Sequence, residues 1–140
     1  MNKLFNIVLL AAASILLAQS AHAQVIVIAN PDFRMATIWK VEVRSIFTGE
    51  SANLRDGSHV SPVLLKQGAV HEEFLSTYLS KTDVAFRAAW RSQVFSGDAM
   101  MPKSFDSEVA VVDYIAHTSG TIGYINKATP HGGVRVLEIK

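Results

Sequence analysis

The pattern of apolar and polar positions along the chain predicts four strands and four helices. Strands are expected at residues 25–29, 59–65, 121–125 and 134–139. The first is a continuous β-branched run without alternation, which suits a strand covered on both faces, as in parallel α/β sheets. Pro62 marks an edge strand or an irregular start for the second. With the helices below, the order β-α-β-α-α-α-β-β predicts a small α/β layer structure.

Apolar side chains that recur every three or four residues predict the helices. The first ends near Gly49, the second follows Gly68, the third starts at Thr82 or Asp83, and the fourth starts at Asp106 or Ser107. The expected inward-facing sets are Trp39, Val43, Ile46 and Phe47; Phe74, Leu75, Tyr78 and Leu79; Phe86, Trp90 and Val94; and Val109, Val112, Ile115 and Ala116.

Residues 1–23 have the three parts of a cleaved signal peptide. Lys3 precedes an apolar run over residues 4–17, and Ala21-His22-Ala23 places small residues where a signal peptidase reads them. The run is shorter than the roughly 20 apolar residues of a membrane-spanning helix. We therefore expect cleavage after Ala23, one domain at residues 24–140, no stable membrane insertion after cleavage, and, in a Gram-negative host, a periplasmic location.

Charge and cysteine content narrow the classes of partner. The chain has 13 Lys plus Arg and 12 Asp plus Glu, so loss of Lys3 leaves 12 of each. A neutral domain without a basic run disfavours nucleic acid and anionic surfaces as partners. The chain has no cysteine, so the fold depends on an ordinary core rather than on disulfides.

The sequence gives little support to an enzyme. His71-Glu72-Glu73 begins like a zinc-protease helix, but the second histidine would fall at position 75, which is leucine. The histidines at 59, 71, 117 and 131 show no metal-ligand spacing, and no Gly-x-Ser-x-Gly elbow or phosphate loop is present. A dispersed Ser-His-Asp arrangement stays open. We expect a protein that is not an enzyme and has neither metal nor cofactor.

Two loops have backbone geometry suited to a small oxyanion. A glycine before a helix exposes unpaired N–H groups at the positive end of the helix dipole. The first loop comprises Lys66, Gln67, Gly68, Ala69 and His71, where Lys66 and a protonated His71 would add charge. The second comprises Thr118, Ser119 and Thr121, whose hydroxyls can donate to an oxyanion. Both segments also fit ordinary turns that bind nothing.

Taken together, several segments resemble phosphate-type substrate-binding proteins of ABC transporters. The segment SIFTGE at residues 45–50 resembles the "IFxGK" helix end of that family. The segment TSGTIGYI at residues 118–125 resembles its "TPGAIGYV" signature, and residues 89–97 resemble its tryptophan helix. The length is that of the short, single-lobe PstS-like members. The resemblance implies one lobe of a type II periplasmic-binding-protein-like fold, a small mixed sheet flanked by helices.

The resemblance also shows what this chain lacks. The family's ligand loop reads roughly Arg-x-x-Asp-Gly-Ser-Gly-Thr. Alignment of Gly68 with its first glycine places Gln67 at the aspartate, Ala69 at the serine and His71 at the threonine. The ionic partner and both hydroxyl donors are therefore missing, and a buried dianion needs such donors.

The resemblance implies an exported solute-binding lobe that takes phosphate or another small oxyanion. Such an open half-site lacks a second wall, which a homodimer could supply. The alternative is a non-enzymatic envelope protein that docks a protein partner and retains a vestigial ligand site. The loop Met100-Met101-Pro102 is the feature that favours this alternative, because methionine adapts to varied contacts.

Overall fold

The computed structural model describes residues 24–140, which form a six-stranded mixed sheet between two layers of helices. The strand order is β2-β6-β1-β5-β3-β4. The strands are β1 (Val25–Ala29), β2 (Thr37–Ile38), β3 (Ser61–Leu65), β4 (Lys103–Phe105), β5 (Thr121–Asn126) and β6 (Arg135–Ile139). The predicted leader over residues 1–23 lies outside the described residues.

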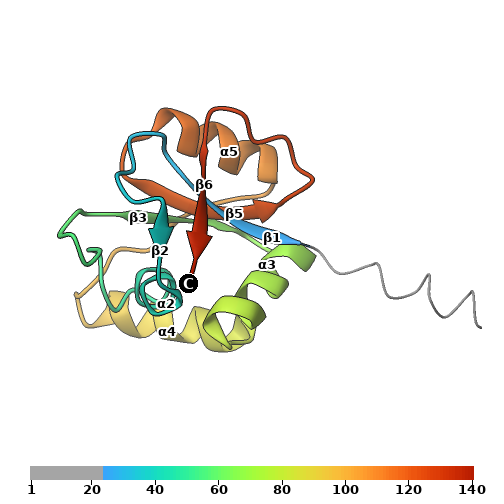
Figure 1. The fold of residues 1–140 in the computed structure, drawn as a ribbon. Coiled ribbons are helices and arrows are strands. Elements are labelled where there is room, and N and C mark those ends of the chain that lie inside the picture. Colours follow the sequence, from blue (N-terminus) through green and yellow to red (C-terminus); the bar gives the residue numbers. More distant parts are fainter. Residues whose placement is uncertain (1–23) are drawn as a thin grey trace, which may run out of the picture.

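Helices cover both faces of this sheet. They are α2 (Lys40–Phe47), α3 (Ala69–Phe74), the π-helical turn η2 (Leu75–Leu79) that continues α3, α4 (Asp83–Phe95) and α5 (Glu108–His117). Figure 1 shows α5 on one face and α2, α3 and α4 on the other. In the part of the chain that the structure describes, no helix combines the length and apolar character needed to cross a bilayer.

The sheet divides into an antiparallel and a parallel half. β1 pairs antiparallel with both β5 and β6, although its continuous apolar run is typical of a strand with parallel neighbours. β3 pairs parallel with β5 and with β4, so β3 is an interior strand and not an edge. Pro62 fits there because pairing with β4 begins only at Val63, so the missing N–H of Pro62 costs no bond on that side.

Close approaches between elements fix the core. An added Cβ at Gly123 in β5 would lie 2.6 Å from the Ile115 side chain, so this glycine lets α5 pack directly on the strand. On the opposite face the ring of Phe74 stacks on Tyr124, with centroids 3.9 Å apart. The indole N–H of Trp90 donates to the carbonyl of Phe47 at 2.9 Å and ties α4 to the end of α2.

Several expectations from the sequence are wrong. Trp39, expected to face inward in the first helix, is 50% exposed, because it is the extended N-cap that precedes the first residue of α2. Val109 was expected to face inward in the last helix, but its side chain is 69% exposed and Val111 is fully buried instead. Val94 was placed on the inner face of α4 and is exposed, because the last turn of α4 leads to the surface together with Phe95. The four strands expected from the sequence also leave out the short edge strands β2 and β4.

Candidate functional site

The candidate site is the loop from β3 to α3, residues 66–68. Because β3, β4 and β5 are parallel, their carboxyl ends share one edge of the sheet, and this loop leaves from it. In open α/β sheets ligands bind outside the carboxyl ends of the strands. The N–H of Lys66 donates to the carbonyl of Phe105 at 3.0 Å, which ties the start of the loop to the end of β4.

Gly68 turns the chain into α3 and leaves backbone donors free. Its φ of 110° is a conformation that residues with a Cβ rarely adopt, and no atom lies within 4 Å of the Cβ position. The first helical bond runs from the N–H of Glu72 to the carbonyl of Gly68. The N–H groups of Ala69, Val70 and His71 therefore have no partner within the helix. The predicted loop residues Lys66, Gln67, Gly68 and Ala69 are all exposed.

Two cationic side chains border this loop. Lys66 Nζ lies 3.4 Å from the Asp106 carboxylate. Arg87, on α4, donates from Nη2 to the carbonyl of Lys66 at 2.6 Å and from Nε to Asp83 at 2.8 Å. Both cations are half exposed, and each has a carboxylate beside it that competes with an incoming anion. The pattern of the sequence did not identify Arg87, because only the fold brings α4 against the loop.

His71 does not contribute its ring to this loop. It is 2% exposed, with Nδ1 2.5 Å from the Tyr124 hydroxyl and Nε2 2.8 Å from the Asp83 carboxylate. The expectation that a charged His71 ring would face an anion is therefore wrong. A buried imidazole requires partners for both nitrogens, and β5 and α4 supply them. His71 can contribute to the loop only through its backbone N–H.

The direction of the hydrogen bonds through His71 follows from the Tyr124 hydroxyl, whose own hydrogen has Nδ1 of His71 as its one acceptor among the described residues. The N–H of Leu65 can only donate, so the Tyr124 oxygen accepts from it at 3.1 Å. The Tyr124 hydroxyl then donates to Nδ1 of His71, and the hydrogen on Nε2 goes to Asp83. Burial raises the pKa of Tyr124, so its hydroxyl stays protonated as a donor. We call Leu65, Tyr124, His71 and Asp83 the relay.

The relay positions the loop rather than performing chemistry. It resembles an Asp-His pair aimed at a hydroxyl, but that hydroxyl belongs to a fully buried tyrosine and reaches no substrate. Burial alone would raise the pKa of Asp83, but hydrogen bonds from Arg87 and His71 outweigh it and hold the pKa below 3.8. Among the described residues, every buried side-chain nitrogen and oxygen has a hydrogen-bond partner. The relay thus links both ends of the loop to β5 and α4.

The second predicted spot, Thr118, Ser119 and Thr121, lies at the opposite edge of the sheet. Thr121 pairs with Ser61 at the start of β3, whereas Lys66 follows its end. A strand of five residues at about 3.3 Å each separates the two spots by roughly 16 Å. The hydroxyl of buried Thr121 donates to the carbonyl of Thr118 at 2.7 Å, and that of Ser119 donates to Asp32. The structure does not bring the two spots together.

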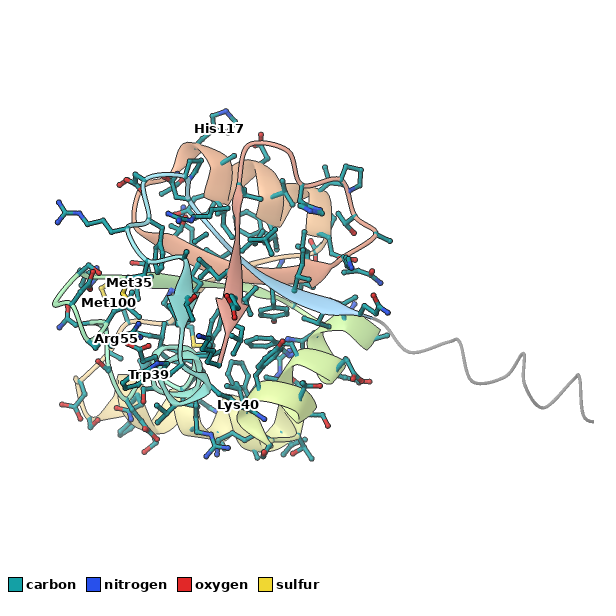
Figure 2. The ribbon with its side chains drawn as sticks, in the orientation of Figure 1. Met35, Trp39, Lys40, Arg55, Met100 and His117 are labelled. Atoms are coloured by element: carbon teal, nitrogen blue, oxygen red, sulfur yellow. The ribbon has the colours of Figure 1, made fainter. Side chains whose placement is uncertain are left out.

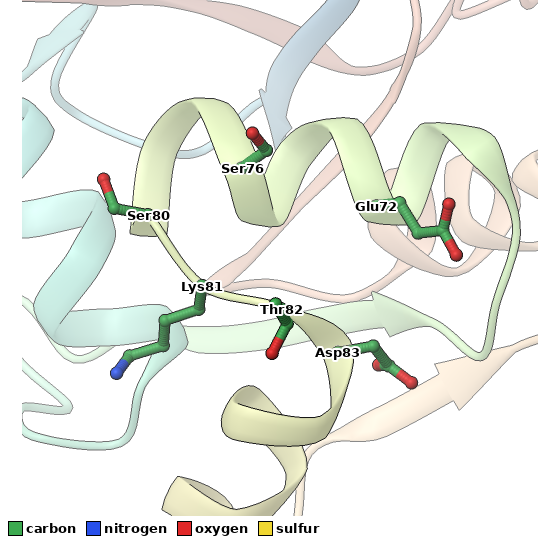
Figure 3. A pocket seen from close by; sticks show the side chains of 6 residues that line it. All are labelled: Glu72, Ser76, Ser80, Lys81, Thr82 and Asp83. Atoms are coloured by element: carbon green, nitrogen blue, oxygen red, sulfur yellow. The ribbon is translucent and has the colours of Figure 1, made fainter.

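A cavity of about 500 Å³ lies next to the relay, between η2 and the start of α4. Figure 3 shows the Glu72 and Asp83 carboxylates at one end and the Lys81 ammonium at the other. Ser76, Ser80 and Thr82 complete its lining. The carboxylates disfavour an anion at the end nearest the loop, so we place the candidate oxyanion site at Gly68 and not in this cavity.

Comparison with known proteins identifies the fold, but neither a sequence family nor a ligand. The sequence matches no family model and no curated protein. The structure is similar to a phosphate ABC transporter substrate-binding protein of Clostridium perfringens, solved with bound phosphate, at a TM-score of 0.64 and 13% identity. It is also similar to a phosphate transport receptor of Vibrio cholerae, at a TM-score of 0.62 and 11% identity. PstS of Borrelia burgdorferi matches at a TM-score of 0.59 and 16% identity.

The similarity covers one part of those larger proteins. Each comparison includes 84% of this chain but only 45%, 46% and 47% of the respective structures. The predicted fold class is confirmed: a mixed sheet flanked by helices that matches half of a PstS-type binding protein. The first two of these structural neighbours are named as a substrate-binding protein and a receptor of transport systems, not as enzymes. At this level of identity the likeness concerns the fold alone.

Proposed function

We propose that this chain is an exported, non-enzymatic binding lobe that takes a small oxyanion such as phosphate at the loop from β3 to α3. The observation that carries the proposal is the group of N–H donors at Ala69, Val70 and His71, opened by Gly68 at the carboxyl edge of the parallel strands. Backbone donors at a helix start, together with the helix dipole, suit an anion. The fold that this chain shares with phosphate-binding proteins supports the same ligand class.

The neighbouring charges set the expected strength of binding. Lys66 and Arg87 attract an anion, but Asp106 and Asp83 neutralise much of their field. Ala69 has no hydroxyl to donate, and the loop is exposed on the surface. Water and salt therefore screen the interaction, and we expect weak binding that decreases as ionic strength rises.

The proposed location rests on the leader-like residues 1–23. Their apolar run and their small residues before Gln24 support cleavage after Ala23 and delivery to the periplasm. N-terminal sequencing of the protein recovered from the periplasm of a Gram-negative host tests this part. A chain that begins at Gln24 supports it, and an uncleaved chain retained in the cytoplasm contradicts it.

A thermal unfolding screen tests the ligand class. Phosphate, sulfate and other oxyanions are compared with chloride at matched ionic strength. Ligand at 100 times its dissociation constant stabilises by about 2.7 kcal/mol, which raises the midpoint of a domain of this size by on the order of 10 °C. A saturable rise with one oxyanion identifies the class. The same midpoint in every anion contradicts oxyanion binding.

A protein-interaction module is the second candidate, and one observation favours it. The end of α4 exposes Phe95 to 97% and Val94 to 42%, which forms an apolar surface. Such surfaces often mark sites of protein contact. This candidate predicts indifference to oxyanions, together with a specific envelope protein that co-purifies with the wild type but not with Phe95→Ser.

A further inference from the structure

A second groove lies at the opposite edge of the sheet from the oxyanion loop. It encloses about 590 Å³ between the start of β3 and the chain that enters β4. Its lining includes one imidazole, His59, and two thioethers, Met100 and Met101. Trp90 and Tyr114 supply aromatic surface to the same groove. The histidine and the methionines come from segments about 40 residues apart in the sequence.

The register of the sheet explains why the segments that carry these three side chains run side by side. β3 and β4 are adjacent parallel strands, and Val63 pairs with Lys103. Continuing that register backward places Met101 opposite Ser61 and Met100 opposite Val60, next to His59. Neighbouring strands lie about 4.8 Å apart. Both segments therefore reach the groove at the same level of the sheet.

The backbone around His59 is firmly held. His59 forms an antiparallel bridge with Asn53, and the next N–H groups donate to Ala52 at 2.9 Å and to Gly120 at 2.8 Å. The imidazole is thus presented from a fixed position. The methionines provide the adaptable part, because three rotatable bonds let each sulfur move toward a common point.

The donor atoms of this groove are uncommitted. Within residues 24–140, the rings of the other three histidines make hydrogen bonds: His71 to Tyr124 and Asp83, His117 to the Asp113 carbonyl, and His131 to the Thr129 carbonyl. The His59 ring makes none to any described residue and is exposed. Met100 is 89% and Met101 53% exposed, so neither side chain is buried in the core.

Two thioethers and an imidazole form a soft donor set. Thioether and thiolate sulfur select Cu(I), whereas hard cations prefer oxygen ligands, and imidazole also suits copper. The chain has no cysteine, so methionine is its only source of sulfur ligands. Glu50 and Asp98 also line the groove, and Lys103 places a positive charge in the same lining.

We propose that His59, Met100 and Met101 form a binding site for one Cu(I) ion. The site is separate from the oxyanion loop, because it lies before β3 and β4 whereas the loop follows β3. The spacing of the histidines in the sequence does not indicate a donor set that depends mainly on methionine.

Anaerobic titration of the purified protein with Cu(I) against a chromophoric competitor tests the proposal. We expect one Cu(I) per chain and a loss of affinity of about tenfold or more in both His59→Asn and the double variant Met100→Leu/Met101→Leu. Silver(I) serves as a redox-inert probe, and the ε-methyl NMR signals of Met100 and Met101 should shift with it. All three residues are exposed, so the variants should keep the wild-type midpoint of unfolding.

Two control variants make the result specific. His117→Gln removes an exposed imidazole on α5, which Figure 2 shows away from Met100, and Met35→Leu removes a thioether that does not line the groove. Both should retain wild-type Cu(I) affinity. If the protein takes no Cu(I) from the competitor, or if the groove variants bind as tightly as the wild type, the site does not exist.

Discussion

The hydroxyl of Tyr124 in β5 donates to Nδ1 of His71 in α3 over 2.5 Å, and these residues are 53 positions apart in the sequence. The same hydroxyl oxygen accepts from the N–H of Leu65 at the end of β3. One buried oxygen therefore satisfies groups at both ends of the candidate loop. The conformation of the loop depends on a residue of a different strand.

Removal of this hydroxyl should destabilise the fold. Tyr124→Phe keeps the ring that stacks on Phe74 but leaves the Leu65 N–H and the His71 nitrogen without a partner. Each buried polar group without a hydrogen-bond partner lowers the free energy of unfolding by roughly 1–3 kcal/mol. Urea unfolding measures the loss. Tyr114→Phe is the control, because the Tyr114 hydroxyl makes no hydrogen bond to any described residue, and it should change stability by less than about 0.5 kcal/mol. Equal effects of the two substitutions would show that the relay contributes nothing.

Acid should weaken the relay through Asp83. The pKa of its carboxyl is lower in the folded state than the ordinary 3.8. The unfolded chain therefore binds this proton first, and the stability that Asp83 provides is present above about pH 4 and lost as pH falls through the lowered pKa. Asp83→Asn should be less stable at pH 7 and should lose less stability than the wild type between about pH 4 and pH 2.

A matched substitution distinguishes the contribution of Asp83 from the loss of stability that acid causes in the rest of the protein. Asp113→Asn serves as the control, because it removes an exposed carboxylate on α5 whose ion pair with His117 is exposed on both sides and contributes little to stability. It should follow the wild-type curve of unfolding free energy against pH. Chemical unfolding at a series of pH values provides both curves. If Asp83→Asn and the wild type lose stability in parallel below pH 4, the Asp83 carboxylate does not carry the acid dependence assigned to it.

The contact between Gly49 and Trp90 should exclude any side chain at position 49. An added Cβ would lie 2.9 and 3.0 Å from atoms of the indole, and φ is +79°. Gly49→Ala should therefore cost about 1–2 kcal/mol of backbone strain plus about 1–3 kcal/mol of overpacking.

Gly57→Ala measures the cost of backbone strain alone, without overpacking. Its φ of +84° is similar, but no atom lies within 4 Å of the Cβ position. Urea unfolding of both variants compares the two costs directly. A Gly49→Ala variant as stable as Gly57→Ala would mean that Trp90 moves aside freely.

The predictable parts of this fold are those that a local pattern encodes. The β-branched run at 25–29 coincides with β1, and Thr82 and Ser107 cap α4 and α5 through their hydroxyls. The edge strand Lys103–Phe105 has only three residues and little apolar character, so no run of residues signalled it. In α5 apolar residues occupy every position from 109 to 112, so periodicity could not identify the buried face.

The candidate site was predictable only as a loop. Gly68 before a helix marks an exposed set of N–H groups in the sequence itself, and Lys66 is its neighbour. The roles of Asp83, Arg87 and Tyr124 depend on contacts across 12 to 59 positions, which no local pattern contains. The i,i+4 spacing of Asp83 and Arg87 is the one local signal that could have indicated an ion pair.

Titration of the ¹⁵N-labelled protein with phosphate at constant ionic strength tests the central claim most directly, since it observes the backbone amides that should bind. We predict saturable shifts centred on Gly68, Ala69, Val70 and His71. They should weaken in Arg87→Gln but persist in Arg91→Gln, which removes an exposed cation one turn further along the same helix. Amides at residues 68–71 that do not respond, or a saturable response centred on Thr118 to Thr121 instead, would contradict the assignment.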